Sequence, residues 1–496
     1  MNSKGTLIYI PTGLNSPELE VLLAKAQIEI KKNSTTILIC SGGTGYACSK
    51  NIYSSKNLCI LCKKKLKKGL DLLEGEFDVI ETPSKINSDL NPDNRFLNKR
   101  YIKDYFFKKC DNGLAALSSY VNLTRDGDLE GSLSGAVLKN LIITSNTLTN
   151  FFIELINSNK FNYYVLFNGR LNQYRPLLRL LKKKNVSNLE ISGSSIKEVN
   201  YQIFDFKDKF SNEINNLYKK INSHYLSNKY KDFSKTHFEK RLRGEISLDV
   251  KAHTKNQKLG LLPNNWDPSK KNIVYFTSSN DEIHTLGKEY FLHFYKDQNE
   301  AVKKISLSIS KLSHLNICLW IRMHPNLSYL RWDFVKFQKN LNKKYKNIFV
   351  IKPESKISSY SLMFNSGIVI GTASSSAIVE SVYWKKPSII IGNSVYAKLK
   401  MVHCPKTHNG LVNLLKKDKI KIFSNNSSKK IVNFWLSGGY KYRNLTGNLK
   451  QGFFFKNKKI DYSTIDKIKY YKIKIFEKFV NSSLAKYKFV KLLRLL

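Results

Sequence analysis

The chain has 496 residues, 42% of them hydrophobic, which is too long for one ordinary hydrophobic core but sufficient for two. Lys and Arg outnumber Asp and Glu by 83 to 38, giving a net charge of +45. The first residues hold only a short apolar run, so we expect no secretory signal. No apolar run approaches roughly 18 residues, so we expect no transmembrane span. We therefore expect a cytoplasmic protein.

The positive charge is spread along the whole chain. It favours anionic partners such as nucleic acid, anionic lipid or phosphorylated substrates, yet the lysines stand beside abundant Asn, Ile, Tyr and Phe, a bias that an AT-rich genome also produces. The cations do not cluster with stacking aromatic residues, and no nucleic-acid-binding module is recognisable. We therefore expect no nucleic acid as a partner.

The first part of the chain alternates strand and helix signals. Residues 6–10 and 36–40 predict buried strands, and a helix beginning near Glu18 predicts the crossover between them. Further strands are predicted at residues 141–143, 163–167 and 189–191. The pattern indicates a parallel sheet in an N-terminal α/β domain over residues 1–205.

Residues 206–268 are rich in Lys, Asn and Ser and are predicted to form a helical linker. Strand signals then resume at residues 273–276, 317–321, 348–351, 367–370 and 388–391. Five short apolar strands separated by helix-length segments predict a second doubly wound α/β domain, over residues 269–455. Residues 456–496 interleave lysine with apolar residues and predict a basic amphipathic helix, which would either pack on the body of the protein or lie on an anionic membrane surface.

Three strand ends of the second domain are polar. Thr277, Ser278, Ser279 and Glu282 follow the first strand, Arg322 and His324 follow the second, and Ser374, Ser375 and Ser376 follow the fourth. Ligands of open parallel sheets bind beyond the carboxyl ends of the strands, so we expect these side chains to contact a substrate.

The serine-rich turn at residues 374–376 precedes a predicted helix that carries Glu380. Backbone N–H groups and the helix dipole at such a turn attract phosphate, and a carboxylate one turn later can accept both hydroxyls of a ribose. Taken alone, such a turn is more often a helix cap, and a histidine such as His324 is more often a structural residue. The three polar ends together predict a site for a nucleoside diphosphate.

Residues 359–396 resemble the nucleotide-sugar-binding signature of GT-B-fold glycosyltransferases of capsule and surface-polysaccharide synthesis. Ser374–Ser376, Glu380, Lys386 and Pro387 occupy its places, and the segment IRMHPN at residues 321–326 is similar to the His-Pro motif that precedes it. The resemblance implies two Rossmann-like doubly wound domains facing a central cleft. It also implies metal-independent transfer of a sugar from a nucleotide-sugar donor, with His324, Ser375 and Glu380 contacting the donor.

Residues 167–170 resemble the FNGR segment of the same proteins. A glycine turn there would present Asn168 and Arg170 to a sugar or an anionic acceptor, such as a growing glycan or its lipid-linked precursor. An inverting transferase also needs a general base. All nine histidines lie at or beyond His224, so a base from the first domain must be a carboxylate, and we prefer Asp126 over Asp111, Asp128 and Glu190.

Four of the seven cysteines crowd into residues 40–62. Cys40, Cys48, Cys59 and Cys62 have the spacing C-x7-C-x10-C-x2-C, which is compatible with a structural zinc ion or an iron–sulfur cluster. The alternative is that they are ordinary free cysteines of an intracellular protein.

The sequence thus predicts a cytoplasmic glycosyltransferase of surface-polysaccharide synthesis, peripheral on the inner face of the membrane if the terminal helix binds lipid. Its nearest rival is a sugar-nucleotide 2-epimerase of the same fold. A non-catalytic assembly protein and a basic nucleic-acid-binding protein are the rivals from other classes.

Overall fold

The computed structural model describes residues 5–481 except 15, 44–45, 132, 159, 185–188, 193–199, 202, 206–209, 228–231, 247–253, 280–284, 286–293, 329, 331, 373–374, 438–439 and 449–451. Its contacts divide the chain into two compact units. The first unit comprises Met1–Glu213 together with Gly439–Leu496, and the second comprises Ile214–Gly438.

The first unit is built on a six-stranded sheet of order β3-β2-β1-β4-β5-β7, parallel except for β7. Its strands are β1 (Gly5–Ile10), β2 (Thr35–Ile39), β3 (Asp78–Glu81), β4 (Phe161–Phe167), β5 (Leu189–Ser192) and β7 (Ile203–Asp205). The parallel order 3-2-1-4-5 is that of a doubly wound Rossmann-like sheet. The predicted strands at residues 6–10, 36–40, 163–167 and 189–191 are confirmed.

The predicted strand at residues 141–143 is wrong, because these residues lie inside the helix α4 (Ser134–Asn157). Buried apolar residues recur along this helix at Val137, Leu138, Leu141, Leu148 and Phe152, which is helical spacing. The run of leucine and two isoleucines is one part of that buried face, and its β-branched composition imitates a strand when it is seen alone.

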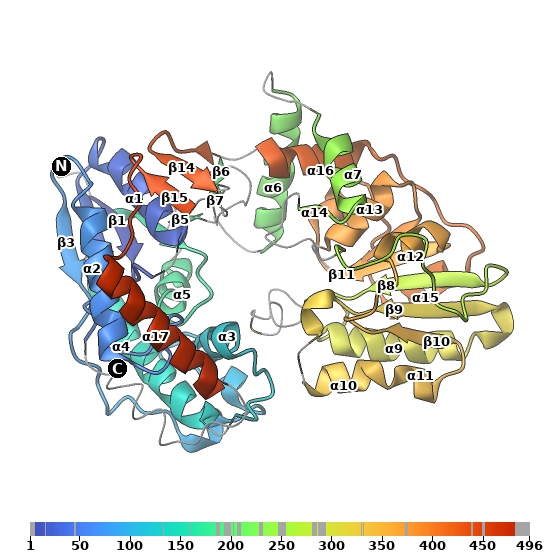
Figure 1. Cartoon of the computed structure of the whole chain (residues 1–496), viewed down its shortest axis with the longest axis horizontal. Helices are drawn as coiled ribbons and strands as arrows, with labels where there is room; N and C mark the ends of the chain where they lie inside the picture. Colours follow the sequence, from blue (N-terminus) through green and yellow to red (C-terminus); the bar gives the residue numbers. More distant parts are fainter. Residues whose placement is uncertain are drawn as a thin grey trace. The chain divides into compact units, whose positions relative to one another are not determined.

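Helices cover the sheet of the first unit, and the C-terminal part of the chain returns to it (Figure 1). The helices are α1 (Glu18–Ile30), α2 (Lys56–Leu70), η1 (Asn94–Leu97), η2 (Ile102–Asp104), α3 (Asn112–Thr124), α4 and α5 (Arg175–Lys183). The returning elements are β13 (Tyr440–Lys441), which pairs with β6 (Asn200–Tyr201), the hairpin of β14 (Leu445–Asn448) and β15 (Gly452–Phe455), and α17 (Thr464–Asn481), which packs along α2.

The second unit contains the five predicted strands in one parallel sheet of order β10-β9-β8-β11-β12. They are β8 (Lys271–Phe276), β9 (Ile317–Arg322), β10 (Ile348–Ile351), β11 (Ile368–Thr372) and β12 (Ser388–Ile391). Residues of one strand alternate between two cores, since Val274 packs on one side and Ile273 and Tyr275 on the other. Both faces are therefore buried, as in a doubly wound sheet.

The helix α6 (Phe210–Tyr225) begins at the end of the first unit and continues into the second. The other described helices of the second unit are α7 (Ser234–Leu242), α9 (Gln298–Ser310), η4 (Ser313–Leu315), η5 (Pro325–Leu327), α10 (Asp333–Lys339), α11 (Leu341–Lys344), α12 (Ser359–Asn365), α13 (Ser376–Tyr383), α14 (Val395–Lys398), α15 (His408–Lys416) and α16 (Asn426–Ser437).

The observed division differs from the predicted ranges. Residues 214–268, predicted as a linker, belong to the second unit, where Phe238 of α7 stacks on Tyr383 of α13. Residues 439–455, predicted to close the second domain, belong to the first unit through the pairing of β13 with β6. Among the described residues, no helix combines the length and apolar character that a membrane span needs.

Candidate functional site

The three polar strand ends of the second unit meet at one edge of its sheet. β9, β8 and β11 are neighbours, and their carboxyl ends are joined by hydrogen bonds. The backbone N–H of His324 donates to Thr277 Oγ1 at 3.2 Å, and the hydroxyls of Ser278 and Thr372 lie 2.6 Å apart. The edge from His324 to Thr372 is therefore held together by hydrogen bonds, with Ser278 and His324 partly exposed and Thr277 and Thr372 buried.

Gln298, the first residue of α9, connects these strand ends. Its Oε1 accepts from the backbone N–H of Ser278 at 2.7 Å and from Thr372 Oγ1 at 3.2 Å, while its Nε2 donates to Ser278 O at 3.2 Å. The side chain is fully buried. Sequence reasoning missed Gln298 because nothing distinguishes a glutamine at the start of a helix until its partners are known.

His324 lies at this edge, and its side chain accepts a hydrogen bond from the backbone. Its Nδ1 accepts from the backbone N–H of Asn326 at 3.2 Å, where His324 caps η5. The proton of the neutral ring is therefore on Nε2, which makes that nitrogen a hydrogen-bond donor. A partly buried imidazole N–H at the carboxyl edge of the sheet is suited to contact an anionic ligand.

Arg322, predicted to contact the substrate, belongs to the interior. It is only 2% exposed, and its Nη1 and Nη2 donate to the backbone oxygens of Lys352 and Ser355 at 2.6 and 3.3 Å. Burial lowers the pKa of Arg322 to about 10. The guanidinium holds the loop after β10.

The N-terminus of α13 lies at the same edge, directly after β11. Ser375 is the N-cap residue, its hydroxyl makes no capping hydrogen bond, and Ser376 is exposed. An ideal Cβ placed on Gly371 would lie 2.5 Å from Ile378 Cγ1, so the glycine allows α13 to approach β11 closely. Among the other predicted contacts, Thr277 and Ser279 are buried, whereas Glu282 and Ser374 lie outside the described residues.

Glu380 has a partner within the protein. Arg241 of α7 donates to its Oε1 from Nη2 at 3.0 Å and from Nε at 3.3 Å, and both side chains are buried. Burial and the adjacent Glu380 carboxylate raise the pKa of Tyr360. If Glu380 binds a ribose, it must do so while it is paired with Arg241. The sequence alone did not predict this ion pair.

The FNGR segment forms the predicted turn at the end of β4 in the first unit. Asn168 and Gly169 have positive φ values of 61° and 79°, and Asn168 is exposed. Arg170 is half-buried and its Nη2 donates to Asn122 Oδ1 at 3.1 Å, which directs the guanidinium toward the end of α3. Both side chains thus lie at the carboxyl edge of the first sheet.

Asp126 has a structural role that sequence reasoning did not anticipate. Its Oδ2 accepts from the Tyr120 hydroxyl at 2.7 Å and from the backbone N–H of Gly131 at 3.0 Å, and its Oδ1 accepts from Glu130 N at 3.2 Å. Both oxygens therefore hold the loop between α3 and α4. A carboxylate engaged in this way is poorly placed to remove a proton from an acceptor.

The alternative base Asp111 is also engaged in contacts within the protein. Its carboxylate forms bidentate hydrogen bonds with Arg175 and with Arg179, at 2.7–2.9 Å. Burial alone would raise the pKa of Asp111, but these two guanidiniums outweigh it and lower the pKa to about 2. Asp111 is therefore an anchor between α3 and α5 and not a base.

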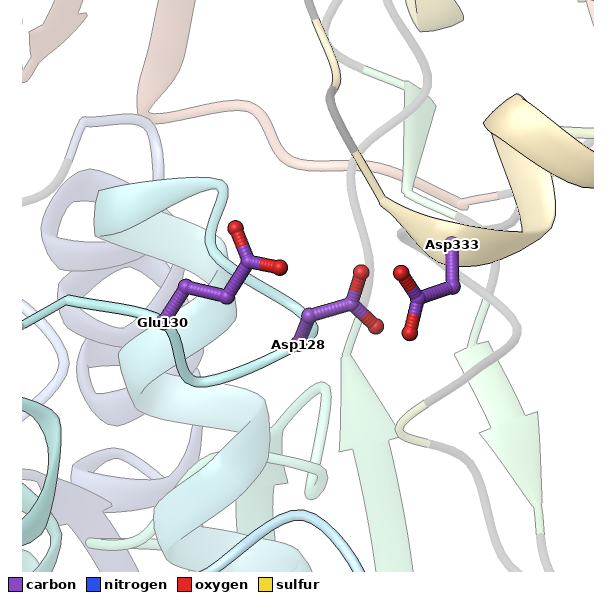
Figure 2. A group of neighbouring side chains, drawn as sticks. All are labelled: Asp128, Glu130 and Asp333. Atoms are coloured by element: carbon purple, nitrogen blue, oxygen red, sulfur yellow. The ribbon is translucent and has the colours of Figure 1, made fainter.

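Asp128, the third candidate, forms an ion pair with Lys99 and lies on the same loop as Glu130 (Figure 2). Figure 2 also draws Asp333, which opens α10 in the second unit. Asp128 and Glu130 belong to the first unit and Asp333 to the second, and we assign no metal site to these three carboxylates. The side chain of Glu190 lies outside the described residues.

The four clustered cysteines lie together at the carboxyl edge of the first sheet. All of them are partly buried free thiols. Burial raises the pKa of Cys40 to about 12 and that of Cys59 to about 11. The pKa of Cys48 is raised by burial and then by the thiols of Cys59, Cys40 and Cys62, which places all four near one another.

No protein-family model matches the chain, and no curated protein matches it in sequence. Among solved structures, it is similar to a UDP-GlcNAc 2-epimerase from Neisseria meningitidis bound to UDP-GlcNAc, at 11% identity and a TM-score of 0.26, over 87% of this chain and 99% of that one. It is similar to Anabaena HepE in complex with UDP-glucose, at 10% identity and a TM-score of 0.28, over 87% and 95%. A glycosyltransferase from Rickettsia africae is similar at 13% identity and a TM-score of 0.25, over 87% and 98%.

Proposed function

We propose that the carboxyl edge of β8, β9 and β11 binds the diphosphate of a nucleotide-sugar, and that the protein transfers the sugar to a surface glycan or its lipid-linked precursor. The observation that supports this proposal best is the hydrogen-bonded continuity of the three strand ends, from His324 through Thr277 and Ser278 to Thr372. It joins the backbone N–H of His324 and the hydroxyls of Thr277, Ser278 and Thr372 along one sheet edge, directly before the N-terminus of α13.

These groups suit a pyrophosphate leaving group. The N-terminus of α13 offers backbone N–H groups and a positive dipole end, and Nε2–H of His324 donates a hydrogen bond to a phosphate oxygen. Charge that develops on the departing diphosphate is stabilised by such fixed donors, so the proposed transfer needs no metal ion.

A sugar-nucleotide 2-epimerase would use the same donor site. All nine histidines lie at or beyond His224, so the first unit contains none. The absence of a histidine there favours transfer over epimerisation.

The experiment is a thermal-shift and calorimetry screen against UDP-, GDP-, CDP- and CMP-sugars. A donor at about 100 times its Kd should stabilise the protein by roughly 2.7 kcal/mol. His324→Ala should weaken the binding. The matched control is His314→Ala, since His314 is exposed just before β9, near the opposite edge of the sheet. If no sugar nucleotide binds, the proposal is wrong, and conversion of a bound UDP-sugar to its 2-epimer would replace transferase with epimerase.

We propose in addition that α17 rests on an anionic membrane surface. One face of this helix packs on the first unit, with Ile473 and Val480 buried, while Ile465, Ile468 and Ile475 are 53–69% exposed. Exposed lysines of the helix flank this apolar stripe. Wild-type protein should sediment with vesicles that contain phosphatidylserine, and Ile468→Ser with Ile475→Ser should abolish this, whereas equal sedimentation of both proteins would contradict the proposal.

A further inference from the structure

The four-cysteine cluster is not used by the proposed transferase chemistry. Cys40 follows β2, Cys48 lies in the loop beyond it, and Cys59 and Cys62 lie in the first half of α2. Three separate segments therefore bring thiols to the carboxyl edge of the first sheet. Chance free cysteines would be expected on unrelated elements, as Cys318 and Cys404 are in the second unit.

Hydrogen-bond donors point at these sulfurs. The backbone N–H of Gly13 donates to Cys62 Sγ at 3.1 Å, Asn51 Nδ2 donates to Cys59 Sγ at 3.2 Å, and the backbone N–H of Gly42 lies 3.4 Å from Cys40 Sγ. Donors around a sulfur stabilise a thiolate over a neutral thiol. Hydrogen bonds of this kind are also a standard means of tuning sulfur ligands of iron.

Two glycines near the cysteines allow backbone segments to pack closely against one another. An ideal Cβ on Gly13 would lie 2.5 Å from the carbonyl oxygen of Cys62, and one on Gly43 would lie 1.7 Å from the carbonyl oxygen of Ser84. Only glycine permits these contacts. The loops after β1 and β2 are therefore held against α2 and the segment after β3, where the sulfurs gather.

The spacing of the sulfurs argues against a closed zinc site. A tetrahedral zinc ion with Zn–S bonds of about 2.3 Å requires its sulfurs to lie about 3.8 Å apart. Among the described residues, which include all four cysteines, no three cysteine sulfurs lie within 4.8 Å of one another. An iron–sulfur cluster, in which each thiolate binds a different iron, holds its sulfurs further apart.

We propose that Cys40, Cys48, Cys59 and Cys62 bind a [4Fe–4S] cluster in the first unit. Each thiol releases its proton when it binds iron.

The cluster would hold the loop that contacts the FNGR region. Asn172 Nδ2 donates to Ala47 O at 2.8 Å, and Gln173 Nε2 donates to Ser49 Oγ at 2.7 Å, so the two residues flanking Cys48 are fixed to the segment that follows Arg170. We therefore assign the cluster a structural role, because these hydrogen bonds fix the loop around Cys48 to the FNGR region.

The test is iron, sulfide and zinc analysis of the full chain purified without oxygen, together with its visible absorption. We expect about four irons and four sulfides per chain. Cys59→Ser and Cys62→Ser should lose most of the iron, whereas the control Cys404→Ser should retain it. Zinc without sulfide would overturn the cluster assignment, and wild-type protein without metal, both as purified and after incubation with ferrous iron and sulfide, would overturn the site. Donor binding by the second unit is measured separately, so failure of the cluster is distinguishable from failure of the proposed function.

Discussion

Arg241 of α7 donates two hydrogen bonds to one oxygen of Glu380 on α13, and both side chains are almost fully buried. The pair connects the residues predicted as a linker to the helix of the candidate donor site. Glu380 is therefore both the predicted ribose contact and a structural residue, and the two roles need separate experiments.

Glu380→Ala should lower the free energy of unfolding by about 3–5 kcal/mol, because it leaves a buried guanidinium without its partner. Arg241→Met with Glu380→Leu removes both charges and should be far less destabilising. Urea denaturation of the single and double variants measures this coupling. Additive losses in the two single variants and the double variant would show that the pair contributes nothing.

Gly371→Ala should destabilise the protein by about 1–3 kcal/mol, since the new methyl group would lie 2.5 Å from Ile378 Cγ1 and push α13 away from β11. Gly367→Ala is the matched control, because its nearest neighbour there would lie at 3.7 Å, an ordinary contact. Thermal denaturation distinguishes them. If the two variants melt alike, close packing of α13 on β11 is not required.

Most strands of both sheets could be predicted from the sequence because buried strands are continuous apolar runs, as at residues 273–276 and 368–370. Residues 141–143 gave the same signal from within a helix. The edge strands β3, whose residues are mostly exposed, and β7 were not predicted. The partners of the site side chains could not be predicted, since Arg241 and Glu380 are 139 positions apart and Gln298 is 74 positions from Thr372. The polar residue types indicated which edge of the sheet carries the site. Only the structure shows that Arg322 is buried while His324 is partly exposed.

Asp111 should make stability depend on pH in the acid range. Its folded pKa of about 2 lies below the ordinary value of 3.8, so its contribution is fully present above about pH 4 and is lost as the pH falls toward 2. The difference corresponds to about 2 kcal/mol. Between pH 5 and pH 2, the free energy of unfolding should fall less steeply in Asp111→Asn than in wild type. The control Asp93→Asn, at an exposed site, should follow wild type. An unchanged slope would contradict the assignment.

Substitution of Asp126 tests whether its carboxylate is the general base or holds the loop between α3 and α4. If its carboxylate holds the loop through Tyr120, Glu130 and Gly131, Asp126→Asn should lower stability by about 1–3 kcal/mol yet leave sugar transfer per folded molecule within a few fold of wild type. Tyr120→Phe, which removes one donor to Asp126 but no carboxylate, should show a smaller loss of the same kind. A loss of transfer of about a hundredfold or more in Asp126→Asn alone, with stability unchanged, would restore Asp126 as the general base.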